Sequence, residues 1–286
     1  MKDSLDDKAL VAKKYFELIN YSNTELYGRL KPFVQEVQPI LPLIDFILDR
    51  LSAVTHLTLN DLLWDAEIVY RAALETFMKL AFIASENGDE RELRIRQFWY
   101  DLAEINKLKQ SEQAKKNLKG FGHIESYRLA YSPLVLTEEE ERVLRGKWSR
   151  VSRQKVEQKW SFSEVMNSLA QGPMNQDSMI WGLAHCYRMA SHVAHGDESG
   201  ILIIKERMER SEKEKAAVTF CHFLRLFSDC LAFSIGTATY AMMFVKQDPK
   251  FFLNILDGTK DIAEIARKYE DVLYSDSVYN RFKNKV

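Results

Sequence analysis

The sequence is poor in the two residues that most often interrupt regular structure. Of its 286 residues, only 11 are glycine and 6 are proline. A chain with so few turn-forming residues is usually built from long helices, and nearly every segment here repeats its apolar residues at the helical period. We therefore predict an all-α fold. A hydrophobic content of 46% and a charged content of 28% are ordinary for a soluble globular protein.

Cysteine and long apolar runs are scarce as well. The three cysteines, Cys186, Cys221 and Cys230, are an odd number and widely spaced, which predicts free thiols in a reducing compartment and not a disulfide frame or a zinc site. The charged N-terminus lacks the apolar core of a signal peptide. The longest nearly apolar stretch, residues 230–245, is shorter than the ~20 residues that span a bilayer. We expect a cytoplasmic protein with no membrane partner.

The chain as a whole is almost electrically neutral. The 40 Lys and Arg residues against 41 Asp and Glu residues give a formal charge of −1, so binding to nucleic acid through charge would need local patches. The sequence also contains no GxGxxG, P-loop, HExxH, GxSxG or CxxC motif. Dinucleotide-binding, NTP-binding, zincin and α/β-hydrolase functions therefore lack sequence support, and no cofactor is expected.

Cap residues and helix breakers divide the chain into elements. The clearest helix begins at Asn60 and ends at Asn87-Gly88. A further helix is expected from the N-cap Thr137 to Trp160. Loops are expected over 120–136 and 196–211, and the apolar run 201–204 is predicted to be a short strand or a plug over the core. The expected domains are an N-terminal helical extension (1–59), a helical bundle (60–246) and a C-terminal helical extension (247–286).

A group of cationic and titratable residues lies in the segment CYRMASHVAHGDE, residues 186–198. On a helix that turns about 100° per residue, His185, Arg188, His192 and His195 share one face, and the apolar residues occupy the other. Three interpretations stay open. The face is simply solvated; the histidines bind a metal, against which the charge of Arg188 counts; or the arginine holds a phosphate while a histidine moves a proton.

The last interpretation gains from a family resemblance. Arg188, six residues and then His195 fit the R-x(4–6)-H pattern of the HEPN superfamily, whose members are all-α bundles found in bacterial toxins, abortive-infection proteins and CRISPR-linked ribonucleases. Arg71 and Glu75, followed by Tyr187, Ser191, His195 and Gly196, also resemble a bacterial domain family of unknown function related to abortive-infection (AbiV-like) proteins. The resemblance covers roughly residues 60–245.

This resemblance implies a HEPN-like bundle that works as a homodimer. It implies a metal-independent endoribonuclease in antiphage defence or toxin–antitoxin systems, with an antitoxin or defence-system protein as a further partner. Arg188 would hold the phosphate, His195 would transfer the proton and His192 would assist or orient.

Residues outside this motif have supporting roles under the same resemblance. Arg71 and Glu75 are either an ordinary ion pair or a pair that fixes His195, and Tyr187 and Ser191 would support the site. Family nucleases carry a polar residue directly after the arginine, where this chain has Met189. The alternative is therefore a catalytically degenerate HEPN-like module that binds a partner protein, nucleotide or RNA.

Two basic stretches are further candidates for RNA binding. Seven basic residues and one acid lie between positions 142 and 159, with Trp148 and Trp160 interleaved. Basic side chains beside aromatic rings suit phosphate contact and base stacking, although a solvated helix with a core tryptophan is the favoured interpretation. The candidate RNA contacts are Arg145, Lys147, Arg150 and Arg153. A second basic face holds Lys107, Lys109, Lys115, Lys116 and Lys119. The isolated histidines, His56, His123 and His222, are interpreted as satisfied helix residues.

Overall fold

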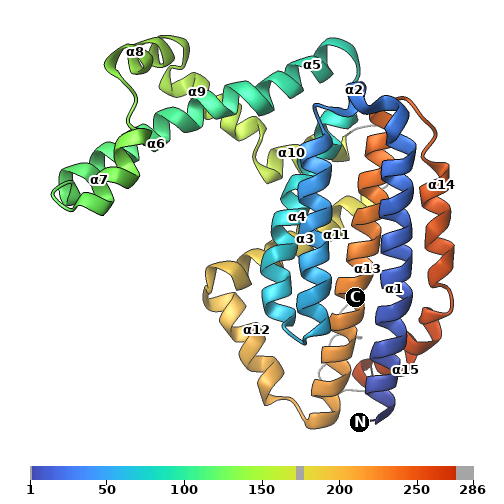
Figure 1. The fold of residues 1–286 in the computed structure, drawn as a ribbon. Coiled ribbons are helices and arrows are strands. Elements are labelled where there is room, and N and C mark those ends of the chain that lie inside the picture. The colour runs from blue at the N-terminus through green and yellow to red at the C-terminus, as the bar shows by residue number, and fades with distance from the viewer. Residues whose placement is uncertain (1, 172–176, 275–286) are drawn as a thin grey trace. The chain divides into compact units, whose positions relative to one another are not determined.

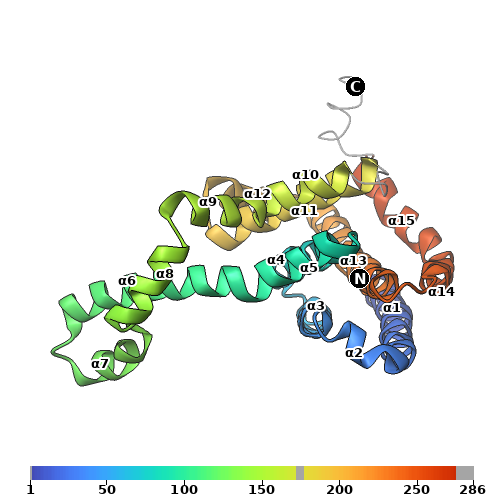
Figure 2. The ribbon, with the colours of Figure 1, turned by 90° about the horizontal axis from the view of Figure 1, so that it is seen from above.

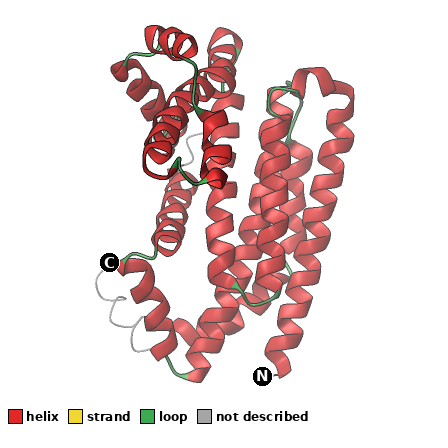
Figure 3. Cartoon of the chain, turned by 60° about the vertical axis from the view of Figure 1, so that its left-hand side comes forward, coloured by secondary structure: helices red, strands yellow, loops and turns green. Residues whose placement is uncertain are grey.

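The computed structural model describes residues 2–171 and 177–274 of the chain. These residues form helices joined by short turns, and no strand occurs among them (Figure 3). The all-α prediction is confirmed. The helices are α1 (Lys2–Leu30), α2 (Val34–Val37), α3 (Leu41–Leu59), α4 (Leu63–Ala84), α5 (Gly88–Arg96), α6 (Leu102–Phe121), α7 (Glu125–Tyr131), α8 (Glu138–Lys147), α9 (Arg150–Lys159), α10 (Phe162–Ala170), α11 (Asp177–His195), α12 (Glu198–Glu209), α13 (Glu212–Phe244), α14 (Lys250–Leu253) and α15 (Ile262–Tyr274).

The chain folds as two compact units, and their boundaries differ from the predicted domains. Unit 1 comprises residues 1–85 and 169–286, and unit 2 comprises residues 86–168. In unit 1, α1 and α3 lie alongside α13 and α4, as Figure 1 shows from the side and Figure 2 shows nearly along the axes of α1 and α3. Helices α1, α3 and α15, which lie in the expected terminal extensions, therefore belong to the same unit as α4 and α13. The second unit is formed by the middle of the chain.

The N-terminal helix belongs to the bundle because it carries a buried apolar stripe. Val11, Ile19 and Leu26 recur at helical spacing on α1 and are at most 7% exposed. The C-terminal helix packs in the same way, since the ring of Tyr269 stacks on Phe220 of α13 with 3.7 Å between centroids. Both terminal segments carry apolar residues at helical spacing, and in the structure α1 and α15 both pack against α13.

The packing of α13 on α4 forms the centre of unit 1. Gly236 of α13 faces the ring of Phe77 of α4 so closely that a Cβ atom at position 236 would lie 2.9 Å from two ring carbons. The same ring packs edge-to-face on Phe233, with 4.7 Å between the centroids, and 5.7 Å from the ring of Tyr240. Missing side-chain volume at Gly236 thus lets an aromatic ring pack directly against helix backbone.

Unit 2 has a small core of its own. Ile105 and Leu108 of α6 pack with Trp148, which is 8% exposed. Buried Ser111 accepts a hydrogen bond from the backbone N–H of Leu136 at 3.0 Å, which joins the start of α8 to α6. Around this core lie the partly buried side chains of Leu136, Leu144 and Val156.

Three expected elements are wrong in detail. The helix predicted from Thr137 to Trp160 is two helices, α8 and α9, because Ser149 begins a new helix by accepting a hydrogen bond from the Ser152 N–H at 3.1 Å. The expected loop over 120–136 contains the end of α6 and all of α7. The expected loop over 196–211 contains α12, capped by Asp197, so residues 201–204 form neither a strand nor a plug.

One described helix, α13, is long and apolar enough by length and composition to cross a membrane. Of its most apolar 18-residue stretch, 56% is buried against the rest of the protein. Its buried residues face α1, α3, α4 and α15, as those of a bundle's central helix do.

The contact between Gly236 and Phe77 predicts opposite effects of two matched substitutions. Gly236→Ala adds a methyl group where the ring already lies 2.9 Å away, and overpacking of about 1–3 kcal/mol outweighs the gain in helix propensity of about 1 kcal/mol. Gly28→Ala in α1, where nothing lies within 4 Å, keeps that gain. In urea unfolding, Gly236→Ala should therefore lower the free energy of unfolding and Gly28→Ala should raise it. Equal stabilisation by both would contradict the packing described.

Candidate functional site

The predicted catalytic residues lie on the C-terminal half of α11. Arg188 and His195 are exposed, and His192 is half-buried with 32% of its side chain accessible. Within the described residues, neither Arg188 nor His195 makes a hydrogen bond or an ion pair. The helix ends directly after His195, where Gly196 has a φ of +57°, a conformation that favours glycine.

His192 is held by the junction between α11 and α12. Its Nδ1 lies 2.7 Å from Oδ2 of Asp197, and the other oxygen of that carboxylate accepts a hydrogen bond from the N–H of Gly200 at 3.1 Å. The hydrogen bond from His192 lowers the pKa of Asp197 below its usual value. Gly200 lies so close to the carbonyl of His192 that a Cβ atom would be 2.4 Å from it. Asp197 therefore orients the ring of His192, whereas His195 has no such partner among the described residues.

Arg71 and Glu75 contact Tyr187 and not His195. Arg71 Nη2 lies 2.9 Å from Glu75 Oε1 and donates to the Tyr187 hydroxyl at 3.1 Å, and this hydroxyl donates to Glu75 Oε1 at 3.0 Å. Of the two interpretations of this pair, the contacts favour the ordinary ion pair, because neither Arg71 nor Glu75 contacts His195 through a hydrogen bond or ion pair among the described residues. The triad joins α11 to α4, so it supports the site through the helix that carries it. Ser191 is half-buried, with no hydrogen-bond partner among the described residues.

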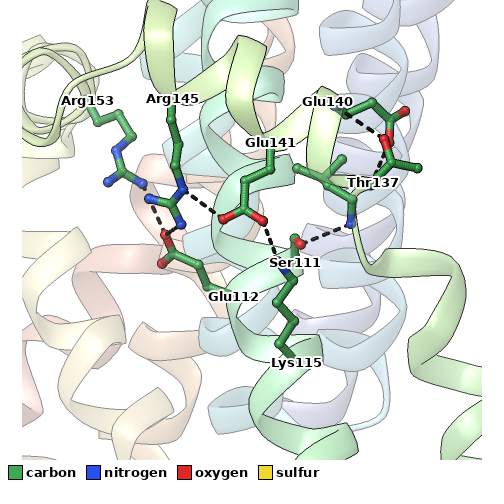
Figure 4. A network of polar contacts seen from close by, with 9 residues as sticks. Ser111, Glu112, Lys115, Thr137, Glu140, Glu141, Arg145 and Arg153 are labelled. Atoms are coloured by element: carbon green, nitrogen blue, oxygen red, sulfur yellow. Dashed lines mark hydrogen bonds and ion pairs between the residues drawn. The ribbon is translucent and has the colours of Figure 1, made fainter.

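Most of the predicted RNA contacts on α8 and α9 are neutralised within unit 2. Arg145 lies 2.7 Å from Glu141 and 2.9 Å from Glu112, and Arg153 lies 3.6 Å from the same Glu112 (Figure 4). Glu141 also contacts Lys115. These ion pairs connect α8 and α9 to α6, although each exposed pair contributes little to stability. The basic residues of this stretch therefore have partners within the protein and do not by themselves indicate a bound ligand.

The other two predicted RNA contacts, Lys147 and Arg150, differ in whether a carboxylate neutralises their charge. Lys147 lies 2.6 Å from Glu104, and Glu104 also accepts a hydrogen bond at 2.7 Å from the indole of Trp148. Trp148 and Trp160 are both buried, at 8% and 5% exposure, as expected for core tryptophans. Arg150 is exposed and makes no ion pair among the described residues, so of the four it alone keeps an unneutralised charge.

A charged cluster that the sequence did not reveal lies between α4, α12 and α13. His222 Nε2 is 2.6 Å from Glu67 Oε1, and His222 Nδ1 is 2.7 Å from Nη1 of Arg207. Arg225 contacts the same oxygen of Glu67 and donates to Asp229 at 2.8 Å. The side chains of His222 and Glu67 are 5% and 7% exposed. His222, Arg225 and Asp229 recur at i, i+3 and i+7 on an otherwise apolar helix, and this spacing is the signal that could have found the cluster.

The contacts of His222 assign its tautomer. A guanidinium can only donate, so Nδ1 accepts from Arg207 and Nε2 carries the hydrogen that is donated to Glu67. Burial and the charge of Arg207 together lower the pKa of His222 to about 3. The nearby Glu67 does not reverse this direction, because Arg225 shares its oxygen and protonation at Nδ1 would break the contact with Arg207. His222 is thus a satisfied helix residue, as the sequence predicted.

Within the described residues, no group of three or more His, Cys, Asp or Glu side chains is placed to hold a metal ion. No protein-family model, curated protein or solved structure matches the chain significantly.

Neutral His222 predicts that the protein loses stability in mild acid. Below pH 6.5 the unfolded state takes up a proton at this residue while the folded state does not until about pH 3, so the free energy of unfolding falls as pH falls between those values. From pH 7 to pH 5 the loss due to His222 should be about 1–2 kcal/mol. Comparing wild type with His222→Gln by urea unfolding at both pH values isolates it from other groups such as Asp229, whose pKa is raised by burial.

The His222→Gln variant should show the smaller loss between pH 7 and pH 5. Arg207→Ala should reduce the loss as well, because removal of the guanidinium lets His222 accept a proton. An identical pH dependence of wild type and His222→Gln would contradict the assigned neutral state.

Proposed function

We propose that the protein is a HEPN-type, metal-independent endoribonuclease that acts as a homodimer in the cytoplasm. The observation that carries the proposal is the face of α11, where Arg188 and His195 are exposed and have no partner among the described residues. Elsewhere many basic side chains are bound to carboxylates, as on α8 and α9. An arginine and a histidine left unpaired on one face suit a charged ligand that the folded chain does not itself supply.

The chemistry requires only these groups and the RNA. His195 accepts the proton of a ribose 2′-hydroxyl, whose oxygen attacks the adjacent phosphorus and displaces the 5′-oxygen. The leaving oxygen takes up a proton from water, and the products are a 2′,3′-cyclic phosphate and a 5′-hydroxyl. Arg188 binds the phosphate oxygens and stabilises the charge that develops on them. His192, oriented by Asp197, assists beside His195.

The spacing on α11 favours a site shared by two protomers. Arg188 and His195 are seven residues apart, which is about 10 Å along a helix. All side chains on a helix lean toward its N-terminus, so the guanidinium of Arg188 and the imidazole of His195 keep this axial separation on the same helix. An antiparallel contact of α11 with its copy about a two-fold axis would instead bring Arg188 of one protomer to His195 of the other.

One residue, Met189, favours a second, non-catalytic function. Met189 follows Arg188 and is half-buried, in place of the polar residue that the family's nucleases carry. This favours a catalytically degenerate HEPN-like module that binds a partner protein, nucleotide or RNA in a defence complex. In either case an antitoxin or a defence-system protein would be the partner that controls it.

The nuclease proposal predicts that two inactive variants restore each other. Arg188→Ala and His195→Ala should each lower the rate of RNA cleavage in EDTA by at least about 100-fold, whereas His185→Ala, at an exposed position on the same helix, should stay within about twofold. Mixing the two inactive proteins under subunit exchange should restore about one quarter of wild-type activity, because half of the dimers then hold one intact site. Cleavage is measured on total RNA and tRNA.

Three results distinguish the alternatives. Failure of wild type to cleave any RNA, together with equal toxicity of wild type and both variants, would reject the nuclease and favour the degenerate module. Cleavage by wild type with no recovery on mixing would keep the nuclease but reject the shared site. Cleavage that stops in EDTA would reject the metal-independent mechanism.

A further inference from the structure

The end of unit 2 that holds α7 carries exposed aromatic side chains. The rings of Phe121 at the end of α6 and Tyr127 of α7 are 5.2 Å apart, and Tyr131 follows at 6.0 Å from Tyr127. Phe121 is 50% and Tyr127 is 40% exposed, and the exposed side chain of Ile124 lies between them in the chain. We call residues 115–134 the α6–α7 tip; Figures 1 and 2 show α7 beside the C-terminal part of α6.

The α6–α7 tip also carries positive charge that is left unneutralised. Its basic residues are Lys115, Lys116, Lys119 and Arg128, and its one acid is Glu125, which gives 4 − 1 = +3 in a chain whose formal charge is −1. Lys115 contacts Glu141. The other three are exposed and have no ion pair among the described residues, in contrast to Arg145 and Lys147 on α8.

We propose that the α6–α7 tip is a docking surface for single-stranded RNA. Exposed aromatic rings beside unpaired cations fit a strand whose bases stack on the rings while its phosphates contact the lysines and arginine. A lipid surface fits less well, since α7 has seven residues and carries Glu125, and the rings of Phe121 and Tyr127 come from two different helices instead of forming the continuous apolar face that a helix buries in a membrane interface.

The docking surface gives the proposed nuclease a second set of residues that bind its substrate, and to that extent it rests on the proposed function. Its physical basis is separate, since none of its residues lies on α11. Binding can therefore be measured in a protein that cannot cleave.

The test uses the full chain with His195→Ala, so that RNA stays intact, and a fluorescein-labelled 12-nucleotide oligouridylate in EDTA. Adding Phe121→Ala and Tyr127→Ala should weaken binding by at least about tenfold. Adding Lys116→Gln, Lys119→Gln and Arg128→Gln removes about three phosphate contacts. The slope of the logarithm of the association constant against log[KCl] should therefore become less negative by about 2. Fluorescence anisotropy between 50 and 200 mM KCl gives both quantities.

Two matched controls lie in the same unit outside the α6–α7 tip. Tyr100, which is 66% exposed, is replaced by alanine as the aromatic control. Arg96, Arg142 and Lys155, all exposed, are replaced together by glutamine as the charge control. Both controls should bind within about twofold of the parent.

Binding by the α6–α7 tip variants equal to that of the parent would overturn the proposal. Tip-dependent binding to phosphatidylserine vesicles without binding of the oligouridylate would also overturn it and would favour a membrane surface. If the tip variants lose RNA binding while wild type cleaves no RNA, the docking surface stands and the nuclease fails. If wild type cleaves RNA and the tip variants bind normally, the nuclease stands and the docking surface fails.

Discussion

The contact between α13 and α4 is the constraint on which the rest of unit 1 depends. At one point Gly236 lets the ring of Phe77 pack against the backbone of α13, and about four turns earlier along α13 the carboxylate of Glu67 binds His222 and Arg225. Apolar packing and a buried charge cluster therefore join the same two helices at separate levels. A slip of α13 along α4 would leave Glu67 buried without its partners, which costs several kcal/mol.

The helices that carry the candidate site are joined to this pair. Tyr187 ties α11 to α4 through Arg71 and Glu75, and Arg207 ties α12 to α13 through His222. The turn between α11 and α12 is then set by Asp197, which caps α12 and holds His192. Tyr187 and His192 of α11 have hydrogen-bond partners, whereas Arg188 and His195 have none among the described residues.

The three histidines that matter occupy three different states. Both ring nitrogens of His222 are engaged in a buried cluster, so it has no free position for proton transfer and serves the fold. One nitrogen of His192 is bound to Asp197, which orients its ring. Neither nitrogen of His195 has a partner among the described residues. Burial and partners, which sequence does not show, separate these roles.

The sequence alone determined the helical class, the apolar stripes and the shared face of Arg188, His192 and His195, because these follow from local periodicity. It did not determine that residues 1–59 join the bundle, that Ser149 begins a second helix or that 196–211 contains α12. The sequence also did not determine which polar side chains pair across the fold. The paired residues are at least 33 positions apart in the chain: Tyr187 with Arg71, His222 with Glu67, and Arg145 with Glu112. Only the tertiary structure decided which charges are neutralised, because a charge is neutralised by what lies near it in space and not in sequence.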